Sequence, residues 1–333
     1  MSDAEFTVSF AGPLVTFQDS GRLGNMRYGV SASGPMDRLS FDAAHAALGN
    51  LAGQTAIEIS LGGLILQCRV GAVTVAITGG DFVIDHAGHK SGSWTILTIE
   101  KGERLTIRAG KAGSWAYLAF AGNLHARDWL GSQATHSPSG FGGGALQTGQ
   151  TLKVLQTSVR ADRLGEVPKP DFAPDGPFRV VTGPQDRHFA KEALNRFVTD
   201  QFKVTDAYDR MGMRLDGPML NLEDALSIPS EPITRGSVQV SGDGVPTVLL
   251  ADHQTTGGYP KIATVISCDT CRLTQLRSGQ SVRFAPVTAQ KAVDVARQYA
   301  TNKARYLAQI AVPRGTLEQR LMSENLIHGW IGD

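Results

Sequence analysis

Short runs of alternating apolar and polar residues, separated by glycine-rich turns, constrain this chain more than any other feature. Successive side chains of a strand point to opposite faces of a sheet, so a period of two predicts strands that are buried on one face. The chain has 38 glycines among its 333 residues, and many lie between such runs. The predicted strands are 73–77, 94–99, 115–120, 151–154, 178–181, 245–250 and 281–284.

Stretches with helical spacing are few, and they do not alternate regularly with the predicted strands. Apolar residues at i, i+3, i+4 and i+7 predict a helix over 41–48, with Asp37 or Ser40 as its N-cap. Further helices are predicted over 189–197, after Thr288, and briefly from a capping box at Thr316. Because a parallel α/β fold needs regular alternation, we predict a mainly β fold with barrel character, few short helices and a helical C-terminal tail.

Four prolines between positions 168 and 177 mark the best domain boundary. Proline lacks a backbone donor and fixes φ, so this stretch is stiff and disfavours a sheet ladder. A chain of 333 residues is long enough for two cores. We predict an N-terminal β-rich lobe over 5–167, a proline-rich linker over 168–177, a C-terminal β lobe over 178–287 and a helical extension over 288–333.

Charge and cysteine content narrow the classes of partner. Lys and Arg number 32 against 31 Asp and Glu, so the chain has no global field to hold nucleic acid or an anionic membrane. Three cysteines argue against a secreted disulfide framework, and the first residues carry no signal-like apolar run, so we expect a cytoplasmic protein. Cys268 and Cys271 form one C-x-x-C without further ligands, and we expect no metal site.

The segment from Asp252 to Lys261, D-H-Q-T-T-G-G-Y-P-K, concentrates polar chemistry after a predicted strand. It combines a carboxylate, an imidazole, an amide, two hydroxyls, a phenol and an ammonium. Its two glycines leave backbone N–H groups open to a carboxylate, a phosphate or a developing oxyanion. The same residues are ordinary in a polar hairpin loop. The residues alone therefore support a pocket and a hairpin equally.

Two arginines, Arg210 and Arg214, are four residues apart and can point the same way. Arginine binds carboxylate or phosphate through two parallel hydrogen bonds, so an anion clamp is one interpretation. A solvated ion-pair cluster with Asp209 and Asp216 is the favoured alternative. Glu231 is bracketed by two prolines, which hold its carboxylate on a stiff backbone. This arrangement suits a general base, and a rigid surface turn explains it as well.

Carboxylates near arginines recur in the first half of the chain, as Asp19 with Arg22 and Asp37 with Arg38. Structural roles are favoured for both pairs, since Asp37 is placed to cap a helix. No G-x-x-x-x-G-K-[ST] phosphate loop, G-x-S-x-G nucleophile elbow or H-E-x-x-H metal helix occurs in the sequence. The chain therefore lacks the common motifs for nucleotide, serine-hydrolase or zinc chemistry.

Taken in order, these segments resemble the carboxyltransferase-domain family that includes the C-type subunit of 5-oxoprolinase, a kinase-inhibitor-antagonising protein of spore formers, and part of urea amidolyase. The resemblance covers about residues 6 to 290, and the segment from Gln254 to Pro260 is its most specific part. The matching segments are 18–22, 33–38, 57–63, 130–132, 209–212, 230–231 and 252–261.

The resemblance implies two β-rich lobes with cyclophilin-like barrel character, and partner subunits. It implies a subunit of an ATP-dependent enzyme that opens 5-oxoproline to glutamate, working with a cyclophilin-like B-type subunit and a LamB/YcsF-type A subunit. One alternative is a biotin-dependent carboxyltransferase component acting on urea or a related amide, with biotin on a separate carrier because the chain has no Met-Lys motif. Another is a non-catalytic regulator that binds a kinase inhibitor.

Each of these reactions must hold a small amide and stabilise charge on its oxygen. The predicted catalytic residues are Glu231, Asp209 and Lys261. The predicted substrate-binding residues are Arg210, Arg214, Gln239, Asp252, Gln254, Thr255, Thr256, Gly258 and Tyr259. Secondary candidates are Asp19, Arg22, Asp37, Arg38 and Glu58.

The chain departs from the usual family pattern at several motif positions. Gln133 and Ala134 replace Arg and Ser, Tyr208 replaces Ser, and His253 replaces Arg; Ser241-Gly242 also replaces a Pro pair. Two positive charges are thereby lost. These departures leave the expected fold unchanged and bear on the identity of the substrate.

Overall fold

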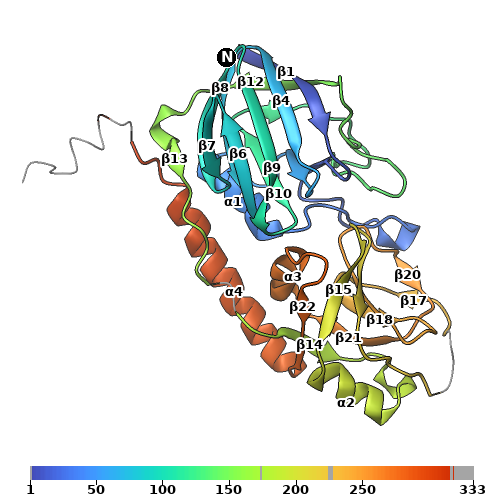
Figure 1. The fold of residues 1–333 in the computed structure, drawn as a ribbon. Coiled ribbons are helices and arrows are strands. Elements are labelled where there is room, and N and C mark those ends of the chain that lie inside the picture. Colours follow the sequence, from blue (N-terminus) through green and yellow to red (C-terminus); the bar gives the residue numbers. More distant parts are fainter. Residues whose placement is uncertain (1, 173–174, 224–227, 316–317, 319–333) are drawn as a thin grey trace, which may run out of the picture.

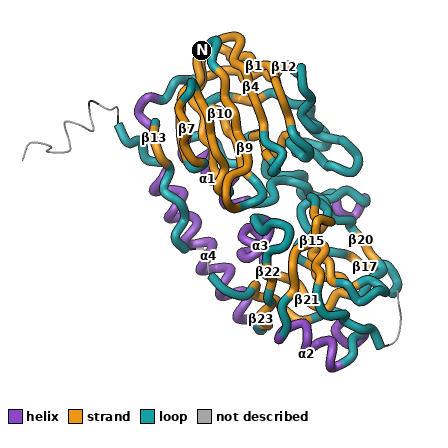
Figure 2. The backbone as a smooth tube through the Cα atoms, viewed as in Figure 1, coloured by secondary structure: helices purple, strands orange, loops and turns teal. Residues whose placement is uncertain are grey.

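The computed structural model describes residues 2–172, 175–223, 228–315 and 318. Strands are the predominant regular structure of the chain (Figures 1 and 2), which confirms the mainly β fold. Strands β1 to β13 form one group of sheets, here called the N lobe, and β14 to β23 form the other, the C lobe. None of the helices in the described ranges is long and apolar enough to cross a membrane.

The N lobe contains two antiparallel sheets, with strand orders β11-β12-β1-β4-β9-β6-β7 and β13-β8-β5-β10-β3-β2. In β1 the alternation is clear, because Ala4, Phe6 and Val8 are fully buried and the residues between them are not. The Phe6 ring lies 5.6 Å from the ring of Phe120 in the other sheet, so the two sheets share one core. The strands are β1 (Ser2–Ala11), β2 (Thr16–Gln18), β3 (Ala56–Ile59), β4 (Leu64–Val70), β5 (Ala72–Thr78), β6 (Asp81–His86), β7 (His89–Gly92), β8 (Thr95–Glu100), β9 (Arg104–Ala112), β10 (Ala116–Phe120), β11 (Asn123–Leu124), β12 (Thr151–Thr157) and β13 (Gly165–Glu166).

The C lobe contains an eight-stranded sheet with strand order β22-β15-β16-β19-β18-β21-β14-β23, and a two-stranded ladder of β17 and β20. The edge strands β22 and β23 are consecutive in sequence, so one short stretch of chain pairs with both ends of the sheet and nearly closes it into a barrel. The predicted barrel character is thereby confirmed. The strands are β14 (Phe178–Thr182), β15 (Phe202–Tyr208), β16 (Gly212–Asp216), β17 (Glu231–Pro232), β18 (Ser237–Val240), β19 (Pro246–Leu249), β20 (Thr256–Gly257), β21 (Lys261–Val265), β22 (Ser281–Val282) and β23 (Phe284–Pro286).

Local sequence signals set the ends of two α-helices. Helix α1 spans Arg38–Leu48, and the Asp37 carboxylate accepts hydrogen bonds from two of its first N–H groups, which confirms the predicted cap. It ends at Leu48 and is capped by Gly49, whose φ of 71° suits glycine. Helix α4 spans Ala289–Ile310, and the Thr288 hydroxyl accepts from the N–H of Lys291.

The other helical elements follow sequence spacing less closely. Helix α2 spans Lys191–Thr199, two residues later than predicted, and α3 spans Ser267–Thr274, where the sequence predicts no helix. Three short 3₁₀ turns are η1 (Met26–Tyr28), η2 (Ala161–Arg163) and η3 (Asp186–His188). The short helix predicted from Thr316 falls outside the described residues.

Helix α4 runs along the side of the molecule and reaches both lobes (Figure 1). It packs against α1 of the N lobe and against α3 and β14 of the C lobe. Lys303 pairs with Asp42 of α1, and the Tyr306 hydroxyl donates to the carbonyl of Pro168 at 2.7 Å. The helical extension therefore braces the two lobes and the linker between them.

Candidate functional site

The segment from Asp252 to Lys261 connects β19 to β21 and forms a short ladder on the way. Its residues Thr256–Gly257 are β20, which pairs antiparallel with β17, and Glu231 lies opposite Gly257. Strand β21 then begins at Lys261. This ladder brings the Glu231 carboxylate to the end of the strand that carries Lys261.

Lys261 is a buried cation at this position. Its side chain is 4% exposed, and Nζ has no hydrogen-bond partner among the described residues. The Oε2 atom of Glu231 lies 3.8 Å from this Nζ, and the Glu231 side chain is 46% exposed. This distance is that of an ion pair and exceeds the usual range for a hydrogen bond. The structure therefore brings together two of the three predicted catalytic residues.

Gln185 joins the two residues, and the sequence pattern does not predict it. Its Nε2 donates to Glu231 Oε2 at 2.5 Å, and its Oε1 accepts from the backbone N–H of Lys261 at 2.9 Å. Since the backbone N–H fixes which end of the amide is the acceptor, Nε2 must face the carboxylate. The only sequence signal is the Gly183-Pro184 turn after a predicted strand.

Gln239, a predicted substrate-binding residue, lies opposite Lys261 in the ladder between β18 and β21. It is 6% exposed, and its amide donates to the carbonyl of Tyr259 at 3.3 Å. A Cβ at Gly257 would lie 2.5 Å from Ile233 Cδ1 and 2.7 Å from this amide, so both side chains would have to shift to accept a larger residue there. At least one of the two glycines therefore serves packing of the loop.

The rest of the segment is open to solvent. Gln254 and Thr256 are exposed, and the Tyr259 side chain is 48% exposed. Thr255 and Gly258 are half-buried; the Thr255 carbonyl accepts from Ile233 N, and the Gly258 carbonyl accepts from Ile228 N. The loop that leads to Lys261 thus presents exposed polar and aromatic side chains to solvent.

Asp252, Arg210 and Glu58 form a separate buried network that joins the lobes. The Arg210 guanidinium donates to both Asp252 carboxylate oxygens, at 2.9 and 3.1 Å, and also to Glu58 and to the Gly34 carbonyl. All three charged side chains are fully buried. Residues predicted to bind substrate are therefore engaged with one another, so the geometry assigns Arg210 to holding the lobes together.

The two carboxyl groups of this network respond differently to the shared arginine. Burial would raise the pKa of Asp252, but the charge of Arg210 and the hydrogen bonds from Arg210 and from the Ser137 N–H together outweigh burial and keep that pKa below its usual value. For Glu58 burial outweighs the same charge, and its pKa is raised. The Arg210 guanidinium makes two hydrogen bonds to Asp252 and one to Glu58. It therefore stabilises the charged form of Asp252 more than that of Glu58.

Asp209 and Arg214 lie apart from the Lys261–Glu231 pair in their contacts. The Asp209 side chain accepts from the N–H groups of Met211 and Gly212, which closes the turn before β16. Arg214 pairs with Asp243 at 2.6 Å, and both side chains are about half exposed. The two arginines thus have different partners, and the geometry does not support their predicted joint clamp on one anion.

The first-half candidates organise loops next to the lobe junction. Asp19 accepts from the Ser132 hydroxyl at 2.7 Å and from the Gln133 N–H at 2.6 Å. Arg22 is buried, donates to the carbonyls of two residues in the same loop, and stacks on the Trp129 ring. Arg38 is exposed at the start of α1.

Two departures from the family pattern have structural partners. Tyr208 is held by a hydrogen bond from the Trp115 indole at 2.7 Å, which links the lobes. His253 is buried, and its Nδ1 contacts the Gln254 carbonyl at 2.5 Å. Burial lowers the pKa of His253 below its usual value.

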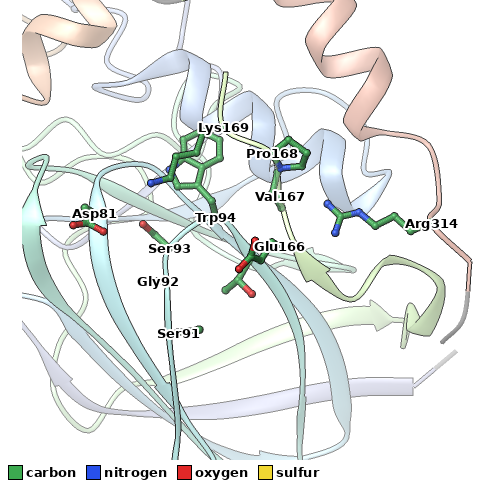
Figure 3. A pocket seen from close by; sticks show the side chains of 11 residues that line it. Asp81, Ser91, Gly92, Ser93, Trp94, Glu166, Val167, Pro168, Lys169 and Arg314 are labelled. Carbon is green, nitrogen blue, oxygen red and sulfur yellow. The ribbon is translucent and has the colours of Figure 1, made fainter. Parts of the chain in front are cut away.

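A cavity of about 700 Å³ lies elsewhere, where β8, β13 and the linker meet Arg314 (Figure 3). It mixes the acids Asp81 and Glu166 with the bases Lys169 and Arg314. No predicted site residue lines it, and within the described part of the chain none of its side chains is a buried polar group without a partner. We therefore place the candidate site at Lys261 and Glu231.

The chemistry of this site follows from its charges. A buried ammonium with unused donors stabilises negative charge on an oxygen, and an adjacent carboxylate accepts a hydrogen bond or a proton. In the described residues no group of three or more His, Cys, Asp or Glu is arranged to hold a metal ion. The site is suited to an amide or carboxylate ligand.

The two-lobed β fold and the order of its motifs define a carboxyltransferase-type protein. The chain belongs to the family described as carboxyltransferase domain, subdomain A and B, whose model matches residues 28–286.

Named relatives make the comparison more specific. The chain is 32% identical to the C-type subunit of the 5-oxoprolinase of Haemophilus influenzae over 288 residues, covering 85% of this chain and 91% of that one. It is 31% identical to the C-type subunit of the Escherichia coli 5-oxoprolinase, covering 90% and 96%. The solved urea amidolyase of K. lactis superposes with a TM-score of 0.81 at 25% identity, over 92% of this chain and 20% of that longer one.

Proposed function

We propose that this chain is the C-type subunit of a heteromeric, ATP-dependent 5-oxoprolinase-like amide hydrolase that converts 5-oxoproline to glutamate. Near full-length similarity to the C-type subunits of two 5-oxoprolinases supports this proposal. The observation that carries it at the site is the buried Lys261 ammonium beside the Glu231 carboxylate. Such a pair holds an amide and stabilises its carbonyl oxygen.

The site is open on one side, which supports a requirement for partners. The Glu231 side chain is 46% exposed, and the loop residues Gln254, Thr256 and Tyr259 are also exposed, so this chain alone does not exclude water from the carboxylate. We propose that the site is completed by a cyclophilin-like B-type subunit and a LamB/YcsF-type A subunit, and that the protein is cytoplasmic and inactive alone. The sequence has no phosphate loop, so ATP is assigned to one of these partners.

Residue roles follow from burial. Lys261 stabilises the carbonyl oxygen, Glu231 handles the proton, and Gln239 and Tyr259 frame the ligand. Asp252, Arg210 and Glu58 hold the two lobes in register. Asp209 remains a more distant candidate for proton handling, through the turn that it closes.

Reconstitution tests the proposal. The chain, purified with the products of its neighbouring genes, should release glutamate from 5-oxoproline only with ATP, and Lys261→Ala should abolish the release. Full activity of that variant would contradict the site assignment. Absence of glutamate release from a well-folded complex would contradict the function.

A second candidate is a carboxyltransferase component acting on urea or a related amide with biotin on a separate carrier. The superposition on urea amidolyase with a TM-score of 0.81 favours it. Transfer of labelled carboxyl from a biotinylated carrier to urea would support this function. Absence of transfer with every biotin carrier of the host would exclude it.

A further inference from the structure

Lys261 and Glu231 form an incomplete pair. Nζ and Oε2 are 3.8 Å apart, which is longer than a hydrogen bond, and the buried Nζ has no other partner within the described ranges. A buried ammonium with unmet donors is costly, so this site favours a ligand that supplies an acceptor. A carbonyl oxygen provides one without adding a formal charge beside Glu231.

Glu231 presents the complementary group. Its Oε2 accepts a hydrogen bond from Gln185 Nε2. No hydrogen bond to its Oε1 is found among the described residues. The side chain is 46% exposed, so the carboxylate keeps acceptor capacity that is accessible from solvent. Because Gln185 is itself anchored on the backbone N–H of Lys261, donor and acceptor are held side by side.

A donor beside an acceptor selects the geometry of an amide. In a trans amide the N–H and C=O groups point in opposite directions, and this is the form of nearly all secondary amides in a chain. In a small lactam the ring forces both groups onto one edge, and urea and primary amides present the same edge. One such ligand can accept from Lys261 and donate to Glu231 simultaneously.

We infer that the Lys261–Glu231 pair recognises the cis edge of an amide, and that Gln185 positions the carboxylate for this contact. The inference rests on the proposed function and deepens it, since both 5-oxoproline and urea carry this edge. Peptide-like trans amides are excluded by geometry. Lactams whose nitrogen is alkylated lack the N–H and are also excluded.

Binding to the assembled complex without ATP tests this inference independently of turnover. We would titrate the complex with 2-pyrrolidinone, N-methyl-2-pyrrolidinone and the trans amide N-methylacetamide, following displacement of labelled 5-oxoproline. Wild type should bind 2-pyrrolidinone at least about 10-fold more tightly than either other probe, as expected for a site that leaves a polar group unpaired.

Variants assign that preference to the pair. Glu231→Gln and Glu231→Ala should reduce the preference for N–H over N-methyl lactam, with Ala abolishing it, and Lys261→Met should weaken all lactams. Lys153 and Glu5 form a surface pair 3.6 Å apart in the N lobe, so Lys153→Met and Glu5→Gln are matched controls that should leave binding unchanged.

The outcomes separate this inference from the proposed function. Equal binding of both lactams to wild type, no lactam binding, or an undiminished preference in folded Glu231→Ala would overturn the inference. Glutamate release without the preference would leave the function standing. The preference without glutamate release would support the amide-edge site and overturn the function.

Discussion

Lys261 is 3% exposed, and its ammonium lacks a hydrogen-bond partner among the described residues, so folding alone leaves it unsatisfied. Natural proteins satisfy most buried polar groups, and the exceptions concentrate at functional sites. The polar loop before it fits both the pocket and the hairpin interpretation, because β20 is part of a hairpin-like ladder and the ladder also borders the site. The feature that distinguishes a site from a simple turn is the cation behind the loop.

The sequence predicts Lys261 and Glu231 as site residues, but it does not predict Gln185, which connects them. Lys261 and Glu231 belong to segments with distinctive neighbours, so both are predictable. Gln185 lies 46 residues from Glu231, in a segment without a polar motif, and only the fold brings them together. The spacing of Arg210 with Arg214 suggests an anion site, while burial, which decides the role of Arg210, is not visible in the spacing.

The burial of His45 predicts how the stability of the protein depends on pH. Its pKa is lowered to about 4 by burial, and its Nδ1 contacts the Asn50 amide at 3.2 Å. The unfolded chain binds a proton below about pH 6.5 and the folded one does not, so stability is lost as pH falls from 6.5 toward 4. At pH 5 the loss should be about 2 kcal/mol relative to pH 7. In urea unfolding, the free energy of unfolding of His45→Gln should fall less between pH 7 and pH 5 than that of the wild type. An equal fall in both proteins would contradict the prediction.

At the scale of elements, the N-caps of α1 and α4 differ in their surroundings. The Asp37 carboxylate accepts from Leu39 N and Ser40 N, each at 3.1 Å, and also from the Gln275 amide of the C lobe at 2.9 Å. The Thr288 cap is exposed and accepts one N–H. The first cap therefore fixes a helix and also a contact between lobes.

Removing each cap should have unequal effects. Asp37→Ala should lower the free energy of unfolding by about 2 kcal/mol, the upper end for caps, because it also removes the hydrogen bond from Gln275. Thr288→Ala should cost about 1 kcal/mol or less. Urea unfolding of both variants measures the difference, and an equal cost would show that the contact with the C lobe contributes nothing.

Elements are predictable where local signals agree with tertiary packing. Helices α1 and α4 have caps and apolar spacing, and the sequence predicts both. Helix α3 has the sequence S-C-D-T-C-R-L-T, which lacks an apolar stripe of helical period, and packing on α4 and β14 stabilises it. Strand β1 is absent from the predicted strands, although Ala4, Phe6, Val8 and Phe10 alternate with polar residues and the first three of them are fully buried.

At the scale of the molecule, buried arginines hold the lobes together. Arg210 of the C lobe binds Glu58 and the Gly34 carbonyl of the N lobe, and Arg235 donates to the carbonyls of Pro35 and Met36. These contacts fix the C-lobe loop that begins at Asp252 against the N lobe. The arrangement of the candidate site thus depends on residues that do not contact the ligand.

Arg210→Met should destabilise the protein strongly. It leaves two buried carboxyl groups without their cation, which costs about 3 to 5 kcal/mol for a broken buried ion pair. Arg214→Met breaks the partly exposed pair with Asp243 and should cost about 1 kcal/mol or less. Urea unfolding compares the two, and a similar small loss in both would contradict the role of Arg210 in joining the lobes.

The central claim is that Lys261 and Glu231 form the amide site of a 5-oxoprolinase-like complex, and ATP-dependent glutamate release tests it most directly. The complex containing the wild-type chain should convert 5-oxoproline to glutamate, and the complex containing Lys261→Met should lose at least about 100-fold in kcat/KM, as for removal of one oxyanion donor. The Lys153→Met control should retain full activity. Equal rates for Lys261→Met and wild type would contradict the account.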